Sequence, residues 1–266
     1  MSFKIVVLAK QVPDTHNVGA DAMNPDGTVN RAALPTVFNP EDLKALEMAL
    51  RVKDQMSGAT VTVVTMGPPR AAEIVKDARN RGADDGLVLS DMRFAGADTL
   101  ATSYALSQVI RQLGQVDLIF GGRQAIDGDT AQVGPQVAEK LEIPQVTYAE
   151  ELIAVDGKSI TIRRRLEHGT ECVKAQLPAL VTVTSAATDC RFPNVHRMLR
   201  LAGEEVRMMN ADMIDADMDR LGMKGSPTKV KKIENVVLAH KESVVLEPTE
   251  AALNELSATL IKEHIL

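Results

Sequence analysis

Short apolar runs alternate with amphipathic segments along the first 141 residues of the chain. The runs are rich in β-branched residues, which is typical of strands buried on both faces of a sheet. They predict strands over 4–9, 59–66, 86–89 and 116–120. Apolar residues at helical spacing predict helices over 39–57, 70–80, 98–113 and 130–141. This alternation predicts an α/β fold with a doubly wound, Rossmann-like parallel sheet. Residues 10–14 are expected to form a turn, and 15–38 a polar loop that includes part of a hairpin.

The pattern changes after residue 146. Residues 153–162 predict a β-hairpin around an Asp156-Gly157 turn, as an addition to the main sheet. Further strands are expected near 170–175 and 180–184. Arg191-Phe192-Pro193-Asn194 then opens a short basic helix.

The last 64 residues follow a third pattern. Residues 203–235 are polar with little periodicity, which is typical of a linker. A helix with one apolar face begins at Pro248. It either packs on its own domain or lies on another subunit. We therefore expect a nucleotide-binding domain over 1–202 and an extended C-terminal arm over 203–266.

Composition narrows the possible functions of this 266-residue chain. The net charge is −6, and no basic stripe with interleaved aromatics is present, which argues against a nucleic-acid partner. No apolar run reaches about 18 residues and no leader segment is apparent, so we expect a cytoplasmic protein without membrane insertion. Cys172 and Cys190 lack metal-ligand spacing, and the five histidines are scattered, so no metal site is expected.

The stretch Gly121–Pro135 carries the clearest candidate chemistry. It forms a strand–loop–helix turn, and ligands of open parallel sheets bind at such turns. Gly128 would let a phosphate approach the N–H groups of the helix, and Asp127, Asp129 and Thr130 offer polar atoms. Asp129 or Thr130 could equally be a simple helix cap. Two more strand ends, Leu8-Ala9 and Met66-Gly67, should line the same crevice and favour nucleotide binding.

Several motifs distributed along the chain are shared with one protein family. They are Val7-Leu8-Ala9-Lys10-Gln11-Val12-Pro13, Asn39-Pro40, Met66-Gly67-Pro68, Gly122-Arg123-Gln124-Ala125-Ile126-Asp127, Arg164 with Gly169 and Glu171, Leu177-Pro178-Ala179, and Arg191-Phe192-Pro193-Asn194. With these motifs the chain resembles the beta subunit of electron-transfer flavoprotein over nearly its whole length. The resemblance implies an adenine-nucleotide-binding fold and a heterodimer with an alpha subunit that carries FAD.

The resemblance also implies what occupies the crevice. Ordinary members hold a structural AMP there and dock on acyl-CoA dehydrogenases. Members of the electron-bifurcating type hold FAD there, take hydride from NADH, and pass electrons singly to the alpha-subunit FAD and to a low-potential carrier such as ferredoxin or flavodoxin. Residues 10–15, 94–99 and 125–135 resemble the bifurcating type, with ordinary AMP binding as the alternative. Oxidation of NADH is expected only from the heterodimer, and no side chain is expected to be catalytic.

Site residues follow from the resemblance by position. Leu8, Ala9, Asn39, Asp42, Met66 and Gly67 would line the adenosine pocket. Ribose and pyrophosphate would be held by Gly122, Arg123, Gln124, Ala125, Asp127, Gly128, Asp129, Thr130, Ala131, Gln132 and Val133. Phe94, Asp98 and Thr99 would lie near the isoalloxazine, unless residues 90–99 are an ordinary connection. Asn39 could also cap its helix.

Protein partners are expected at three further segments. Residues 191–201 resemble the loop that docks on acyl-CoA dehydrogenases, with Arg191, Phe192, Asn194, Met198 and Leu199 as its contacts and Met198 or Leu199 as the apolar anchor. Intrachain packing of this loop is the alternative. Arg165 departs from the family pattern, in which an acidic residue is common next to the conserved arginine. Arg163–Arg165 could face a flavin phosphate or an acidic surface of the alpha subunit. The C-terminal helix is expected to contact the alpha subunit.

Overall fold

The computed structural model describes residues 3–14, 34–228 and 245–265. The chain divides into two compact units, residues 1–231 and residues 232–266, which are described separately below. No helix in the described ranges is long and apolar enough to span a membrane.

Within the described residues of the first unit, one nine-stranded sheet has the order β11-β5-β4-β1-β6-β10-β7-β8-β9. Its strands are β1 (Lys4–Ala9), β4 (Thr60–Met66), β5 (Asp85–Leu89), β6 (Leu118–Gly122), β7 (Gln145–Val155), β8 (Ser159–Leu166), β9 (Gly169–Gln176), β10 (Ala179–Val183) and β11 (Arg207–Met209). The strands from β11 to β7 pair in parallel, whereas β8 and β9 extend the sheet as antiparallel strands. The predicted α/β fold, its parallel sheet and the hairpin addition are confirmed.

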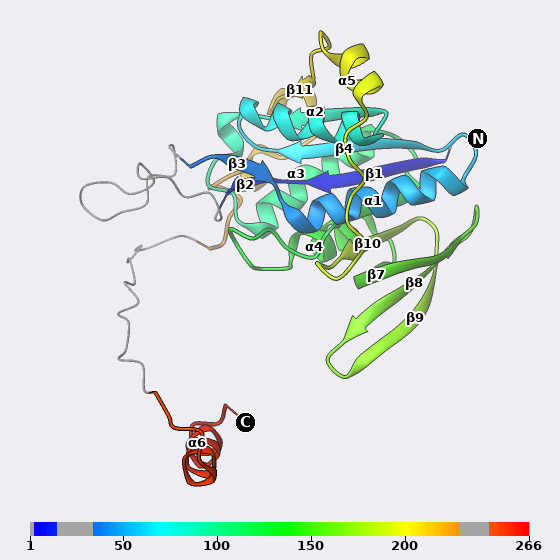
Figure 1. Cartoon of the computed structure of the whole chain (residues 1–266). Coiled ribbons are helices and arrows are strands. Elements are labelled where there is room, and N and C mark those ends of the chain that lie inside the picture. Colours follow the sequence, from blue (N-terminus) through cyan, green and yellow to red (C-terminus); the bar gives the residue numbers. More distant parts are fainter. Residues whose placement is uncertain (1–2, 15–33, 229–244, 266) are drawn as a thin grey trace. The chain divides into compact units, whose positions relative to one another are not determined.

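Helices cover both faces of this sheet (Figure 1). The covering helices are α1 (Pro40–Gln55), α2 (Ala72–Arg81), α3 (Thr99–Gln112) and α4 (Val133–Leu141), whereas α5 (Val195–Leu201) packs against α2. The described residues also form single 3-10 turns, which are η2 (Pro69–Ala71), η3 (Met92–Phe94), η4 (Ala211–Met213) and η5 (Met218–Arg220). Alternate residues of β1 enter two separate cores, because side chains of a strand alternate between faces. Ile5 and Val7 pack with α1 and α2, whereas Val6 and Leu8 pack with α3 and α4.

Residues 10–14 were predicted to form a turn, and this prediction is wrong. Gln11–Pro13 form a short strand, β2, that pairs antiparallel with β3 (Thr36–Phe38). The pairing brings the chain back to β1, since the backbone N–H of Asn39 donates to the Lys10 carbonyl oxygen at 3.0 Å. The start of α1 is thereby placed at the end of β1.

The prediction of a linker over 203–235 is wrong for residues 203–228, whereas 229–235 lie outside the described residues. Strand β11 extends the sheet in parallel with β5, and Ala211, Ile214 and Leu221 are buried in the core shared with α3 and α4. Gly222 makes the close packing possible because it adopts a φ of 51°, and a Cβ there would lie 2.1 Å from the Arg93 carbonyl oxygen. Polar composition therefore concealed a segment that completes the domain.

The second unit contains α6 (Glu250–Lys262), which confirms the predicted C-terminal helix. The Thr249 hydroxyl accepts a hydrogen bond from the Ala252 N–H and caps its first turn. Leu253, Leu256 and Ile261 are exposed. The contact of this arm with an alpha subunit stays a prediction.

Candidate functional site

Three strand ends converge at the carboxyl edge of the sheet, as predicted. Strand β1 lies between β4 and β6, and its register pairs Ala9 with Thr65 and Leu8 with Gly121. The chain order of the strands reverses at β1, so the edge between β1 and β6 is the switch point at which open α/β sheets bind ligands. The predicted residues Leu8, Ala9, Met66 and Gly67 therefore share one edge with the start of the Gly121–Pro135 loop.

The first turn of α1 holds that loop in place. Asn39 donates from Nδ2 to the Gln124 carbonyl oxygen at 2.9 Å and accepts from the Ile126 N–H at 3.2 Å. Asn39 occupies the N-cap position of α1, but its side chain makes no cap bond to the helix, so the prediction of a side-chain cap is wrong. Glu41 accepts from the Gln124 N–H at 2.9 Å and from the Arg123 guanidinium at 3.3 Å. Glu41 was not among the predicted site residues, so its role in the loop was missed.

Asp42 joins the ends of β1 and β6. Its two carboxylate oxygens accept the backbone N–H groups of Lys10 and Gly122, each at 2.8 Å. Burial raises the pKa of Asp42 to about 7, against the opposing effect of these two N–H donors. Gly122 is required at this contact, since a Cβ would lie 2.5 Å from Asp42 Oδ1.

The outer part of the loop is fixed by two side-chain contacts. The Lys10 ammonium pairs with both oxygens of Asp127, at 2.7 and 2.8 Å. The Gln124 amide donates to Asp129 Oδ1 at 2.6 Å. Gly128 lies beyond these contacts, and a Cβ on it would have no atom within 4 Å. A side chain at residue 128 would thus extend into open space rather than into protein.

Helix α4 starts at Val133, three residues later than predicted, so the cap interpretation of Asp129 or Thr130 is wrong. Asp129 and Ala131 have φ values of 47° and 52°, and these left-handed conformations keep residues 129–131 out of the helix. Among the described residues, the backbone N–H groups from Thr130 to Gly134 have no hydrogen-bond partner. This run of donors continues into the positive end of α4, which is the arrangement that binds phosphate.

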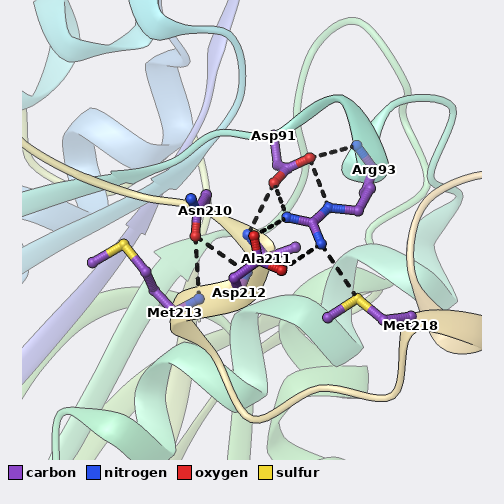
Figure 2. A network of polar contacts seen from close by, with 7 residues as sticks. All are labelled: Asp91, Arg93, Asn210, Ala211, Asp212, Met213 and Met218. Atoms are coloured by element: carbon purple, nitrogen blue, oxygen red, sulfur yellow. Dashed lines mark hydrogen bonds and ion pairs between the residues drawn. The ribbon is translucent and has the colours of Figure 1, made fainter.

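Residues 90–99 pack against the segment that follows β11. The Arg93 guanidinium joins Asp91 to Asp212, with contacts of 2.6 Å to both carboxylates (Figure 2). Arg93 holds the pKa of Asp91 well below its usual range. Phe94 is buried in the core, so its side chain supports the loop.

Asp98 and Thr99 were also predicted near the flavin ring. Asp98 caps α3 and accepts hydrogen bonds from the N–H and hydroxyl groups of Thr228. The Thr99 hydroxyl donates to Gln132 at 2.8 Å, which ties the start of α3 to the donor run. The structure therefore brings Thr99 to the Gly121–Pro135 loop, whereas Phe94 and Asp98 hold neighbouring backbone.

The predicted docking segment divides into anchors and exposed apolar residues. Arg191 donates from Nε to Glu47 at 2.9 Å and from Nη2 to Asp54 at 2.8 Å, so it fastens the segment to α1. Asn194 caps α5. Phe192 and Leu199 are 90% and 74% exposed, and Met198 and Val195 are also exposed. The candidate contact surface thus consists of these apolar side chains.

Arg163, Arg164 and Arg165 each pair with a carboxylate of their own sheet. Arg163 contacts Glu151, Arg164 contacts Glu171, and Arg165 contacts Glu150, at distances between 2.5 and 3.3 Å. These ion pairs connect β8 to its neighbours β7 and β9.

Comparisons with known proteins show the family of this chain. A family model described as the electron transfer flavoprotein domain matches residues 26–210. The electron transfer flavoprotein subunit beta of Clostridium acetobutylicum is 45% identical over 262 residues, which cover 98% of this chain and 99% of that protein. The caffeyl-CoA reductase-Etf complex subunit CarD of Acetobacterium woodii is 43% identical over 227 residues, 85% of this chain and 86% of that subunit. Protein FixA of Sinorhizobium fredii is 40% identical over 266 residues, 97% of this chain and 92% of that protein. The chain therefore belongs to the beta subunits of the electron transfer flavoprotein family.

Proposed function

We propose that this beta subunit binds FAD at the edge between β1 and β6 and takes part in flavin-based electron bifurcation with NADH as the hydride donor. The observation that carries the choice of a dinucleotide is the run of five N–H donors from Thr130 to Gly134. A single phosphate needs fewer donors than this run offers, whereas a pyrophosphate presents two charged groups to it.

Further features fit the same cofactor. Gly128 leaves open space beside the donor run, where a pyrophosphate-bearing chain can pass. The buried Thr65 hydroxyl, next to Met66 at the end of β4, has no partner among the described residues. An unpaired buried hydroxyl is costly, so a ligand group at this edge would satisfy it.

The chemistry that FAD supplies when bound is acceptance of hydride from NADH and release of the electrons one at a time. The chain itself contributes binding and positioning. Asn39, Glu41 and Asp42 fix the loop, the donor run holds the pyrophosphate, and Leu8 and Ala9 provide an apolar wall.

The partners in this proposal are an alpha subunit with its own FAD, a CoA-ester dehydrogenase or reductase, and a low-potential carrier such as ferredoxin or flavodoxin. The caffeyl-CoA reductase complex to which one relative belongs supports the CoA-ester partner. The exposed apolar residues of the 191–201 segment suit docking, because such side chains gain most from burial in a partner pocket.

Denaturing the purified complex with its alpha subunit and measuring the released nucleotides tests the proposal. Two FAD per heterodimer is the expected result. One FAD and one AMP would instead establish ordinary AMP binding and end the bifurcation proposal.

A variant pair tests the placement of the dinucleotide. Gly128→Leu should remove the beta-site nucleotide and leave the alpha-site flavin, since its side chain enters only the open space beside the donors. Gly157→Leu is the matched control, because Gly157 also has no atom near its Cβ position but lies in the hairpin turn. Equal loss of both flavins from Gly128→Leu would contradict the placement.

A further inference from the structure

A hollow lies beside α3, away from the edge between β1 and β6. It has a volume of about 330 Å³ and is lined by Leu100, Tyr104, Asp219, Arg220, Lys224, Gly225, Ser226 and Pro227. This volume lies at the lower end of the range of small-molecule sites, about 300–1,000 Å³. Six of these eight lining residues come from the segment first predicted to be a linker.

Arg220 supplies the main charge of this hollow. Its guanidinium carbon lies 3.9 Å from the centroid of the Tyr104 ring, a stacked arrangement that holds the cation in one orientation. Among the described residues, Arg220 forms no ion pair. Lys224 pairs with Asp219, so these two lining charges cancel and Arg220 leaves the lining with a net positive charge.

A nearby lysine adds to the positive potential. Burial and the charge of Arg220 lower the pKa of Lys140, on α4. The charges of Lys140 and Arg220 therefore oppose each other, in a chain whose net charge is −6. An anionic ligand would relieve this repulsion.

The backbone around Arg220 is closely constrained. A Cβ on Gly225 would lie 2.1 Å from the Arg220 carbonyl oxygen, so the turn after Arg220 requires glycine. The Tyr104 hydroxyl accepts the Asp217 N–H at 2.8 Å, and the Ser226 hydroxyl donates to the Gly222 carbonyl oxygen at 2.7 Å. The orientation of Arg220 is therefore built into the fold before any ligand arrives.

We propose that this hollow is a second nucleotide site, in which Arg220 binds a phosphate and Leu100 and Pro227 contact the sugar or base. Charge-assisted contacts from a planar guanidinium suit phosphate oxygens. The site is separate from the FAD crevice, although Thr99, the neighbour of Leu100, contacts Gln132 of the donor run. The phosphate could belong to a dinucleotide such as the hydride donor or to a free mononucleotide. The proposal needs only the hollow and does not depend on which nucleotide occupies the crevice.

Calorimetric titration of the purified complex, with its alpha subunit and its bound nucleotides, tests this site. The probes are ADP-ribose, AMP and inorganic phosphate. ADP-ribose or AMP should bind, and Arg220→Gln should weaken binding at least about tenfold, the loss expected when a charge-assisted contact is removed. Leu100→Glu should weaken it as well, because it adds a negative charge to the wall. Tighter binding of ADP-ribose than AMP identifies a dinucleotide, and equal binding identifies a mononucleotide.

Matched variants separate this site from the crevice. Arg207→Gln removes an equal charge at β11, outside the hollow, and should leave binding unchanged. Binding that survives Gly128→Leu but fails in Arg220→Gln supports the proposal, even if the crevice proves to hold AMP. Unchanged affinity in Arg220→Gln, binding of no probe, or equal affinity for phosphate and the nucleotides would overturn it.

Discussion

The backbone N–H of Gly122 donates a 2.8 Å hydrogen bond to Oδ1 of Asp42. This contact joins the end of β6 to the first turn of α1, and Asp42 reaches β1 through its second oxygen. The nucleotide loop therefore leaves the sheet in a direction set by a helix that begins 82 residues earlier, as the Arg123–Glu41 contact also shows.

Gly122→Ala should destabilise the protein and empty the crevice. The added Cβ would lie 2.5 Å from Asp42 Oδ1 and 2.8 Å from both the Asp42 nitrogen and Glu41 Cβ, so the start of α1 must move. We expect a loss of about 1–3 kcal/mol, the usual cost of overpacking, measured by urea unfolding. Gly157→Ala adds the same methyl group where no atom lies within 4 Å and should change stability little. Equal losses in both variants would contradict the close contact.

The buried carboxyl of Asp42 should make stability depend on pH. Its pKa of about 7 in the folded protein exceeds its ordinary value of 3.8, so the folded state binds more protons between these pH values. Stability from this group is therefore full below pH 4 and falls as the pH rises to about 7. Asp42→Asn should remove this slope in urea unfolding between pH 4 and 7, although it costs about 1–3 kcal/mol because an amide cannot accept both N–H groups.

Asp156→Asn is the comparison variant for the pH dependence of stability. Asp156 accepts the N–H groups of Lys158 and Ser159 in the hairpin turn, and these bonds lower its pKa. Its contribution is lost as the pH falls, the opposite direction from Asp42. An unchanged pH slope in Asp42→Asn would show that Asp42 stays ionised when buried.

The local sequence pattern was sufficient to predict the parallel strands of the sheet and the position of the candidate site. β-branched runs and intervening helices predicted four parallel strands, and the convergence of Ala9, Met66 and Gly121 followed from their carboxyl ends. Side-chain roles within the site were harder to predict, because local rules favoured caps. Asn39 precedes a Pro-started helix, yet its partners, Gln124 and Ile126, are 85 and 87 residues away.

The folded segment after residue 203 was missed for a related reason. Its order depends on distant partners: β11 pairs with β5, and Asp212 pairs with Arg93, 119 residues earlier. The residues of this segment that enter the core, such as Ala211, Ile214 and Leu221, are separated by polar residues. They therefore show no periodic hydrophobic pattern in the sequence. Arg220, on which the proposed second nucleotide site depends, lies within the same segment.

Asn39→Asp tests whether residue 39 holds the loop or caps the helix. Aspartate caps helices as well as asparagine does, so a capping role predicts no loss of stability. The observed role requires the amide, because aspartate cannot donate to the Gln124 carbonyl oxygen. We expect a loss of about 1–3 kcal/mol in urea unfolding and reduced retention of the beta-site nucleotide. Full stability and nucleotide content in Asn39→Asp would restore the cap interpretation.

Phe192→Ala and Leu199→Ala should weaken docking without weakening the fold. Both side chains are exposed, so the free energy of unfolding should change by less than about 0.5 kcal/mol. Apolar anchors of an interface cost about 2 kcal/mol or more when truncated, so affinity for a CoA-ester dehydrogenase should fall about 30-fold. Surface plasmon resonance with the complex as analyte measures this loss.

Two further variants separate docking from folding at this surface. Met92→Ala truncates an equally exposed apolar side chain on η3 and should leave the affinity for the dehydrogenase unchanged. Arg191→Gln breaks the contacts to Glu47 and Asp54 that fasten the segment to α1. It should therefore lower both the stability and the affinity, since the apolar residues would lose their fixed position. If Phe192→Ala and Leu199→Ala bind as tightly as the unmodified complex, the dehydrogenase docks elsewhere, and these residues require another partner.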